Sequence, residues 1–315
     1  MGEIIVVAIG GNSLIRDAAH MSVGDQYESV VETAKHLADI VESGFRVVIV
    51  HGNGPQVGFI LRRSALAFEA AGLHEVPLSS CVADTQGAIG FQIQQALDIE
   101  MNKRGLDKKT ATLVTRVAVD ENDAKFQNPS KPIGSFFSAE QRAELEQRYP
   151  DWQFMEDAGR GFRRVVPSPE PIEIVELELI KDVIAKDYVV VACGGGGIPV
   201  VKKPEGYLAV DAVIDKDLAS ALLSAQIDAK RFVISTGVDY VYLNFGKENE
   251  QRLEQVTLQQ IKTYVEEGHF AAGSMLPKIE AAIRFLENGG EEVIITSPEY
   301  IKMALNYEIG TRITQ

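Results

Sequence analysis

The sequence is poor in cysteine, tryptophan and basic residues. Its 315 residues include 2 Cys and 1 Trp, and 31 Lys+Arg stand against 45 Asp+Glu, which gives a formal net charge of −14. Cys81 and Cys193 are far apart and form no C-x-x-C, which argues against a disulfide framework or a cysteine-based zinc site. The acidic balance argues against non-specific binding to nucleic acid or to an anionic membrane, since both need a basic surface. It does not exclude a small anionic ligand, because a few lysines or backbone N–H groups can reverse the field in one cleft.

Long apolar runs are also missing. No stretch approaches the roughly 18 uninterrupted apolar residues that a membrane helix needs. Glu3 precedes the first apolar run and no basic leader is present, which argues against a signal peptide. A composition of 45% hydrophobic and 24% charged residues is ordinary for a globular protein. We therefore expect a soluble, cytoplasmic protein.

Apolar segments alternate between strand-like and helix-like spacing along most of the chain. Strands are predicted over residues 3–9, 45–50, 188–193, 231–235 and 292–296, and helices over 30–41, 217–225 and 278–287. Strand–helix–strand order predicts parallel pairing with right-handed crossovers. The pattern therefore indicates an α/β fold on a mainly parallel open sheet.

Three of the predicted strands end in glycine clusters, at Gly10-Gly11-Asn12, at Gly52-Asn53-Gly54 and at 194–197. Ligands of open α/β sheets bind beyond the carboxyl ends of the strands, where glycines let backbone N–H groups approach an anion. A single such cluster is usually only a turn. Three at one edge of a sheet favour a cleft that handles phosphate.

The two standard nucleotide signatures are absent. Gly246-Lys247 is followed by Glu248 and forms no G-x-x-x-x-G-K-[ST]. The G-x-G-x-x-G pattern fails at Val57 and at Pro199. P-loop kinases and Rossmann-type dehydrogenases are therefore disfavoured, and phosphate would be handled by another scaffold.

Residues 120–171 differ from the rest of the chain in composition and in periodicity. They hold NPSKP, DAGRGFRR and the proline-rich PSPEP, with weaker periodicity. Six aromatic side chains would be enough for a small core of their own: Phe126, Phe136, Phe137, Trp152, Phe154 and Phe162. We interpret this stretch as an inserted subdomain or flap and not as a linker.

Several motifs resemble those of the amino-acid-kinase superfamily, and most closely those of carbamate kinases. The resemblance covers nearly the whole chain and is carried by AIGGNSL (8–14), HGNGPQVG (51–58), FQNPSKPIG (126–134), EDAGRGFRRVVPSPEP (156–171), CGGGGIPVV (193–201), AVIDKDLAS (212–220), DYVYLNF (239–245) and EEGHFAAGSMLPKIEAAIRFLE (266–287). NPSKPIG and GRGFRRVVPSP are specific to the carbamate kinase branch, and the other motifs are shared more loosely with acetylglutamate and uridylate kinases.

The resemblance implies a three-layer α/β/α sandwich on a mainly parallel sheet, usually in a homodimer. An N-terminal lobe (1–185), with the inserted flap at about 120–171, would hold carbamate or carbamoyl phosphate, and a C-terminal lobe (186–315) would hold the nucleotide. The implied reaction is carbamoyl phosphate + ADP ⇌ carbamate + ATP, running toward ATP in arginine catabolism. The alternatives are another kinase of the superfamily and a non-catalytic protein that binds carbamoyl phosphate or nucleotide.

The resemblance also implies roles for individual residues. The carbamoyl group and the transferred phosphoryl would contact Gly10, Gly11, Asn12, Gly52, Asn53 and Gly54. The nucleotide would contact Gly195, Gly196, Asp239, Tyr242, Met275, Pro277 and Lys278. The catalytic residues would be Lys131, Lys216, Asp217 and Lys278. Lys131 would cover the phosphoryl from the flap, and Asp217 would orient lysines through charge-assisted hydrogen bonds.

Taken singly, these residues also have structural interpretations. An isolated lysine is usually a solvated surface group, and Asp217 fits a stabilising acid at a helix N-terminus. Cys193 fits a buried residue at a strand end better than a nucleophile, and His51 fits a structural role. The histidines show no metal-ligand spacing, so we expect Mg²⁺ to arrive with the phosphates of ATP or ADP. Leu276 and Gly237 depart from the family pattern, which bears on nucleotide preference.

Overall fold

The structure is a computed structural model that describes residues 2–10, 22–156, 159 and 161–315. Among these residues the largest sheet has eight strands, and all neighbouring pairs except β16–β17 are parallel. In spatial order the strands are β15 (Gln255–Thr257), β17 (Thr311–Thr314), β16 (Glu292–Thr296), β12 (Arg231–Ser235), β1 (Ile4–Ile9), β2 (Arg46–His51), β9 (Val189–Val191) and β3 (Thr110–Thr112). The predicted mainly parallel α/β sheet is confirmed.

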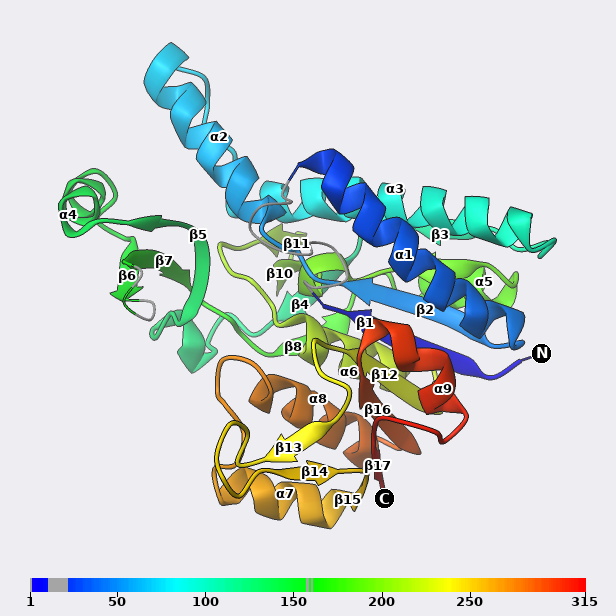
Figure 1. Ribbon diagram of the computed structural model, residues 1–315. Helices are drawn as coiled ribbons and strands as arrows, with labels where there is room; N and C mark the ends of the chain where they lie inside the picture. The colour runs from blue at the N-terminus through cyan, green and yellow to red at the C-terminus, as the bar shows by residue number, and fades with distance from the viewer. Residues whose placement is uncertain (1, 11–21, 157–158, 160) are drawn as a thin grey trace.

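Helices cover both faces of this sheet, so the molecule has three layers (Figure 1). Alternate residues of β1 point to opposite sides: Ile5, Val7 and Ile9 pack in one core, Val6 and Ala8 in the other. The first face carries α1 (Val23–Glu42), α3 (Leu78–Lys103) and α9 (Ile301–Leu305). The second carries α5 (Leu177–Ala185), α6 (Lys216–Gln226), α7 (Leu258–Glu266) and α8 (Leu276–Glu287).

Smaller sheets and short turns flank the main sheet. One has the order β11 (Gly206–Ala209), β10 (Ile198–Lys203), β4 (Arg116–Val119), β8 (Pro171–Ile174), and one is the pair β13 (Val241–Leu243) and β14 (Gln251–Leu253). Among the described residues, the single-turn 3₁₀ helices are η2 (Ala124–Phe126), η3 (Gly194–Gly196) and η4 (Pro298–Tyr300). No helix in the described parts of the chain is both long and apolar enough to cross a membrane.

A separate three-stranded sheet and one helix project from the main body, beside the protruding helix α2 (Gln56–Ala71) (Figure 1). This inserted subdomain consists of β5 (Lys131–Phe137), β7 (Phe162–Val166), β6 (Gln153–Glu156) and α4 (Ala139–Arg148). Its α4 side is fastened to α2: Arg148 donates to Glu69 at 3.0 Å, and the Tyr149 hydroxyl donates to Glu75, just beyond α2, at 2.6 Å. The two protruding parts are therefore joined away from the main sheet.

The base of the subdomain is joined to the body at two further places. Gly58 of α2 faces Gly134 of β5 so closely that a Cβ atom on Gly58 would lie 3.0 Å from the Gly134 Cα. Glu170 accepts from both Lys125 and Arg284, and Arg284 belongs to α8. Ion pairs and close backbone packing thus position β5 over the carboxyl end of the main sheet.

The predicted strands and helices are all present, and most boundaries differ by at most two residues. The helix predicted over 30–41 is α1, which begins seven residues earlier, at Val23. The expected aromatic core of the insertion is only partly correct. Phe137, Trp152 and Phe154 pack together, with ring centroids 5.9 and 6.3 Å apart. Phe126 instead packs against the main core, and Phe136 is 41% exposed. Aromatic composition predicts that a core exists but not which neighbouring core each ring joins.

Candidate active site

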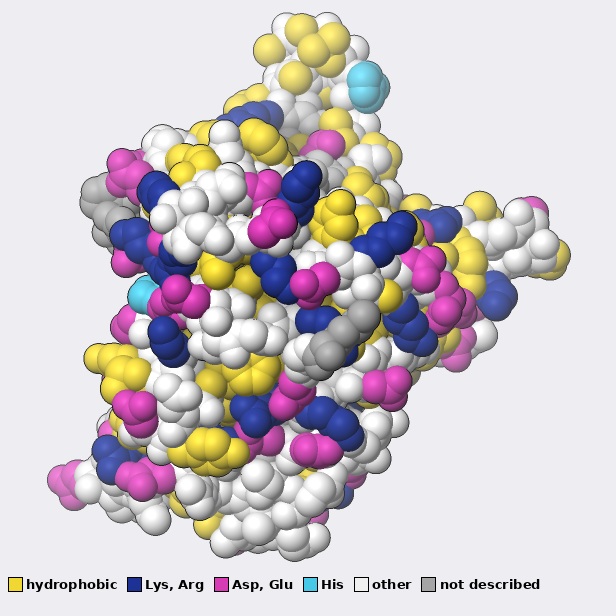
Figure 2. Space-filling model, turned by 90° about the vertical axis from the view of Figure 1, so that its right-hand side faces the viewer, with side chains coloured by type: hydrophobic (Ala, Val, Ile, Leu, Met, Phe, Trp, Pro, Cys, Tyr) yellow, Lys and Arg dark blue, Asp and Glu magenta, His cyan; other side chains and the backbone are white. Residues whose placement is uncertain are grey.

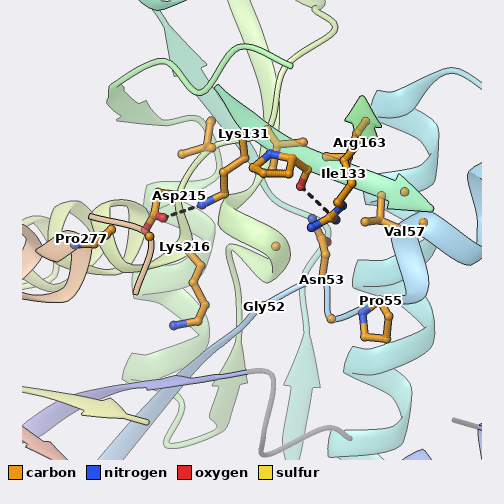
Figure 3. A pocket seen from close by; sticks show the side chains of 18 of the residues that line it. Gly52, Asn53, Pro55, Val57, Lys131, Ile133, Arg163, Asp215, Lys216 and Pro277 are labelled. Carbon is orange, nitrogen blue, oxygen red and sulfur yellow. Dashed lines mark hydrogen bonds and ion pairs between the residues drawn. The ribbon is translucent and has the colours of Figure 1, made fainter. Parts of the chain in front are cut away.

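Two adjacent cavities form the candidate site. The larger, of about 760 Å³, lies beyond the carboxyl end of β2, between α2, the inserted subdomain and the start of α6 (Figure 3). This is where ligands bind in open α/β sheets. The smaller, of about 220 Å³, lies near β13, and Ser274 and Lys278 line both cavities. One ligand can therefore extend from one cavity into the other.

The turn after β2 lines the larger cavity. Gly52, Asn53 and Gly54 line it, and Gly54 has φ +55°, which glycine adopts without strain. Helix α2 begins at Gln56 without a side-chain cap, and α8, which begins at Leu276, also lacks one. Uncapped helix N-termini present unpaired N–H groups and the positive end of the helix dipole. The start of α2 therefore favours an anion. At α8 the Leu276 and Lys278 N–H groups already donate to the Ala271 and Met275 carbonyl oxygens, so only the helix dipole contributes there.

Three lysines and two aspartates form ion pairs across the larger cavity. Lys131 Nζ of β5 donates to Oδ2 of Asp215, the N-cap residue of α6, at 2.8 Å (Figure 3). Lys216 Nζ donates to Asp217 Oδ1 at 2.5 Å, and Lys278 Nζ donates to Asp217 Oδ2 at 3.3 Å. The fold thus brings the three predicted catalytic lysines, which are far apart in the sequence, around the start of one helix.

The Asp215 carboxyl group of the Lys131–Asp215 pair is ionised at neutral pH. Burial by itself would raise the pKa of Asp215, because it disfavours the carboxylate. The charge and hydrogen bond of Lys131, the charge of Lys216 and the backbone N–H of Asp217 together outweigh burial and hold the pKa of Asp215 below its usual value. The carboxylate therefore stays ionised and attracts the Lys131 ammonium.

The larger cavity is positive although the protein is acidic. Among the described residues that line it, the charged side chains are Arg62, Lys131, Arg163, Lys216 and Lys278 against Asp215 and Asp217. Five positive and two negative charges leave 5 − 2 = +3, in a chain whose net charge is −14. On the face shown in Figure 2, charges of both signs are interspersed. The local field of the cavity, and not the net charge, therefore selects an anionic ligand.

Asn53 is held in place by residues of α3 and η3. Buried Thr85 places its Oγ1 2.6 Å from Asn53 Oδ1 and 2.7 Å from the Val82 carbonyl oxygen, and its single hydroxyl proton can be donated to only one of them. Gly195 leaves room for this side chain, since a Cβ atom there would lie 2.0 Å from Asn53 Oδ1. Within the Asn53 amide only the N–H₂ group can donate to a ligand.

His51 lies buried directly behind this turn. Its Nδ1 is 2.8 Å from the Gly52 carbonyl oxygen, so Nδ1 carries the proton that it donates. The ring fills the space beside Gly194, where a Cβ atom would lie 2.4 Å from His51 Nε2. Burial, helped by the charge of Lys216 and opposed by the Gly52 hydrogen bond, lowers the pKa of His51 to about 4. The imidazole is therefore neutral at pH 7 and supports the turn, as the structural interpretation predicted.

The glycine turn after β9 is fixed by buried hydrogen bonds. Gln86 Nε2 donates to the carbonyl oxygens of Thr115 and Gly194, at 3.0 and 2.9 Å. The Cys193 N–H donates to Thr115 Oγ1 at 3.0 Å, and Cys193 itself has φ +50°. Burial raises the pKa of the Cys193 thiol, so it is no nucleophile at neutral pH. The prediction of a buried strand-end cysteine is confirmed.

The smaller cavity is lined mainly by aromatic and apolar side chains. They include Tyr240, Tyr242, Phe245, Phe270 and Met275. The Tyr242 and Phe245 rings lie with centroids 5.8 Å apart. An aromatic and apolar cavity next to a cationic one suits a ligand with a flat apolar end and an anionic end.

The structure gathers most of the site residues that the sequence predicted. Those that line the larger cavity are Gly52, Asn53, Gly54, Lys131, Gly195, Lys216, Asp217, Pro277 and Lys278. Tyr242 and Met275 line the smaller one. Gly10, Gly196 and Asp239 line neither cavity. Gly10 lies against the Ser235 carbonyl and Gly196 against the Ile214 carbonyl. Asp239 accepts a 2.7 Å hydrogen bond from the Ser297 hydroxyl. Gly11 and Asn12 lie outside the described residues.

Sequence reasoning missed Asp215, Arg62, Arg163 and Thr85. Asp215 stands before a predicted helix, where Asp is a favoured N-cap, but its partner Lys131 is 84 residues away and no local pattern links them. Arg163 reaches from β7 toward Asn53 (Figure 3). Arg62 lines the cavity from α2. Only the packing of the subdomain against α2 brings these two arginines to one cavity.

Comparisons with known proteins agree with this geometry. The sequence model of the Amino acid kinase family matches residues 3–297. A carbamate kinase-like protein of Escherichia coli is 53% identical, and a carbamate kinase of Staphylococcus epidermidis is 47% identical, each over 99% of both chains. The solved carbamate kinase of Giardia lamblia bound to AMP-PNP superimposes with a TM-score of 0.92 at 39% identity, over 99% of this chain and 98% of that one. Leu276 is the first residue of α8, and Gly237 lines the smaller cavity.

The buried neutral His51 predicts a specific pH dependence of stability. In the unfolded chain His51 binds a proton below the ordinary histidine pKa of 6.5, whereas in the folded protein the lowered pKa means that it does so only below about 4. Stability is therefore lost as the pH falls through this window, by about 2–3 kcal/mol. The free energy of unfolding can be measured by urea denaturation between about pH 7.5 and about pH 4.5. In His51→Gln this free energy should no longer show the fall with decreasing pH that His51 causes. The exposed control His74→Gln should keep it. Parallel pH profiles for wild type and His51→Gln would contradict the assignment.

Proposed function

The chain belongs to the amino acid kinase family, and from this premise we propose that it is a carbamate kinase, which transfers a phosphoryl group between carbamoyl phosphate and ADP. The observation that carries the proposal is the convergence of Lys131, Lys216 and Lys278 in one cavity, beside the turn that follows β2. Carbamate kinases at 47% identity over nearly the full length support it.

The chemistry of this reaction matches the residues of the cavity. A carbamate oxygen is already anionic at neutral pH, so its attack on phosphorus needs no general base. The transfer needs alignment of the reactants and positive charge spread over the transferring phosphoryl. Lysine ammonium groups and helix N-termini supply that charge without gaining or losing a proton. A neutral His51 and an un-ionised Cys193 are consistent with the same chemistry.

We assign the two substrates, carbamoyl phosphate and the nucleotide, to different parts of the two cavities. Gly52, Asn53 and Gly54 would bind the carbamoyl end, and Lys131 would contact the transferred phosphoryl. The lobe of residues 1–185 would thus hold the acceptor. The lobe of 186–315 would hold the nucleotide, with Tyr242 and Met275 beside the nucleoside and Lys216 and Lys278 on its phosphates. Asp217 would orient both lysines.

Mg²⁺ would enter with the nucleotide. Within the described residues, no group of three or more His, Cys, Asp or Glu side chains is placed to hold a metal ion. The Asp215 carboxylate accepts from Lys131 and from the backbone N–H of Asp217. The Asp217 carboxylate accepts from Lys216 and Lys278. Both oxygens of each carboxylate are therefore in use. A magnesium ion carried by phosphate oxygens and waters fits this donor set. When bound, Mg²⁺ would neutralise part of the phosphate charge.

The direction and the setting of the reaction are part of the proposal. We propose that the enzyme runs toward ATP at the end of arginine catabolism, in the cytoplasm where ADP is available. Carbamate decomposes in water, which draws the reaction toward ATP. A strain that lacks the gene should then obtain less ATP from arginine and grow poorly on it. Unchanged growth of this deletion strain would count against the setting.

We also propose a homodimer that forms along α3 and β3. Strand β3 is the last strand of the eight-stranded sheet, and Val114 directly beyond it is 55% exposed. On α3, Phe91 and Ile99 are 61% and 44% exposed and lie eight residues apart, on one face of the helix. Light scattering should give twice the chain mass of 34.4 kDa. Phe91→Glu should reduce it to that of a monomer, whereas Leu66→Glu on α2 should not.

The test of the reaction is ATP formation from ADP, Mg²⁺ and carbamoyl phosphate, with acetyl phosphate and acetylglutamyl phosphate as comparison donors. Rapid ATP formation with carbamoyl phosphate alone is the expected result. A preference for another donor would assign the protein to a neighbouring branch of the family. Thermal stabilisation by carbamoyl phosphate or ADP without turnover would instead indicate a binding protein.

The lysines of the cavity should separate turnover from nucleotide binding. Lys131→Ala removes a cation from the transferred phosphoryl and should lower kcat by on the order of 100-fold, with little change in the Kd for ADP. Lys278→Ala should weaken ADP binding and turnover together, because Lys278 lines both cavities. Lys262→Ala, on α7 and paired with Glu287, is the control and should change neither. Equal kinetics of Lys131→Ala and wild type would refute the assignment of Lys131.

A further inference from the structure

Asp215 uses its two carboxylate oxygens for two different tasks. Oδ1 accepts the backbone N–H of Asp217 at 2.9 Å and so caps α6. Oδ2 accepts from Lys131 Nζ at 2.8 Å. The Asp215 side chain is only 14% exposed, whereas that of Lys131 is 38% exposed. One largely buried carboxylate therefore links the start of a helix in the main body to the first residue of β5 in the inserted subdomain.

This link defines where the Lys131 ammonium lies. A half-exposed lysine on a surface strand has many rotamers of similar energy, and holding it in one of them costs side-chain entropy. The other lysines of the cavity, Lys216 and Lys278, are held by Asp217. Lys131 is held by Asp215, whose carboxylate is ionised because its pKa is lowered. Asp215 also reduces the repulsion between the ammonium groups of Lys131 and Lys216.

We propose that Asp215 is a positioning residue that aims Lys131 at the transferred phosphoryl, so that turnover depends on the Lys131–Asp215 ion pair. This inference rests on the proposed phosphoryl transfer. Asp215 acts through Lys131 and needs no contact with the substrate. Two simpler roles compete with it: a helix cap alone, and a structural link that holds the subdomain without setting the direction of Lys131.

Asp215→Asn separates the charge from the cap. Asn is as good an N-cap as Asp, so its side-chain oxygen can still accept the Asp217 N–H, while the attraction for Lys131 is lost. We expect kcat to fall by on the order of 100-fold, as for a misplaced catalytic group. The KM for ADP should stay within about threefold, because Lys216 and Lys278 keep their partner. Unchanged kcat would overturn the proposal.

A double-mutant cycle tests whether Asp215 acts through Lys131. In a chain that already carries Lys131→Met, Asp215→Asn should lower kcat by less than about threefold, because the group that it positions is gone. If the fold-decreases in kcat of the two single variants multiply in the double variant, Asp215 acts independently of Lys131, and the proposal is overturned.

Arg284→Gln is the matched control for docking. It removes the Arg284–Glu170 pair, which also ties the base of the subdomain to the main body, and leaves Lys125 on Glu170. It should leave kcat within about twofold. A fall in kcat as large as that of Asp215→Asn would mean that loosening the subdomain is sufficient, and would overturn the specific role of Asp215.

Hydrogen exchange provides a readout that needs no turnover. Amides of β5 (Lys131–Phe137) should exchange faster in Asp215→Asn than in wild type, since the anchor of the strand is lost. Amides of α6 should exchange at the wild-type rate because the cap is kept. Equal rates in β5 would overturn the proposal. If wild type forms no ATP from carbamoyl phosphate, the carbamate kinase proposal fails, while faster exchange confined to β5 would still show that Asp215 anchors the strand that carries Lys131.

Discussion

Three ammonium groups in one cavity can stay close together only if carboxylates lie between them, and this constraint organises the candidate site. Both carboxylates come from the start of α6: Asp215 is its N-cap residue, Asp217 is in its first turn, and Lys216 lies between them in sequence. Cations from β5 and α8 converge on this short segment. Like charges that would otherwise repel are thus held in place before an anion arrives, which is the condition for electrostatic catalysis with little reorganisation.

The remainder of the fold keeps that helix start and the β2 turn in register. Parallel strands end at the same edge of the sheet, so the turn after β2 and the glycine turn after β9 lie side by side. His51, Asn53 and Gln86 fill the space between these turns and form buried hydrogen bonds there. Glycine at 194 and 195 is required by this packing, because a Cβ atom at either position would overlap His51 or Asn53. A rigid layer therefore supports the more exposed lysines.

Much of this could be predicted from the sequence, and the remainder has identifiable physical reasons. Strand and helix periodicity predicted the elements, since burial on one or two faces leaves a local pattern. Motif resemblance predicted Lys131, Lys216 and Lys278 in one place. The partner of Lys131 was not predicted, because an ion pair between residues 84 positions apart depends on how the insertion docks. The same reason explains Arg62 and Arg163, and it explains why Phe126 joined the main core. Long-range contacts of an inserted segment leave no periodic signal.

The fastening of α2 to the inserted subdomain has a consequence for ligand traffic. An outward swing of the subdomain must either break the Arg148–Glu69 and Tyr149–Glu75 contacts or carry α2 along with it. The N-terminus of α2 is also one of the uncapped helix ends that face the cavity. If the two move as one body, the entrance widens and the anion loses a helix dipole in the same step. Product departure would then be driven by withdrawal of electrostatic attraction, and not by the lifting of a cover from an unchanged binding surface.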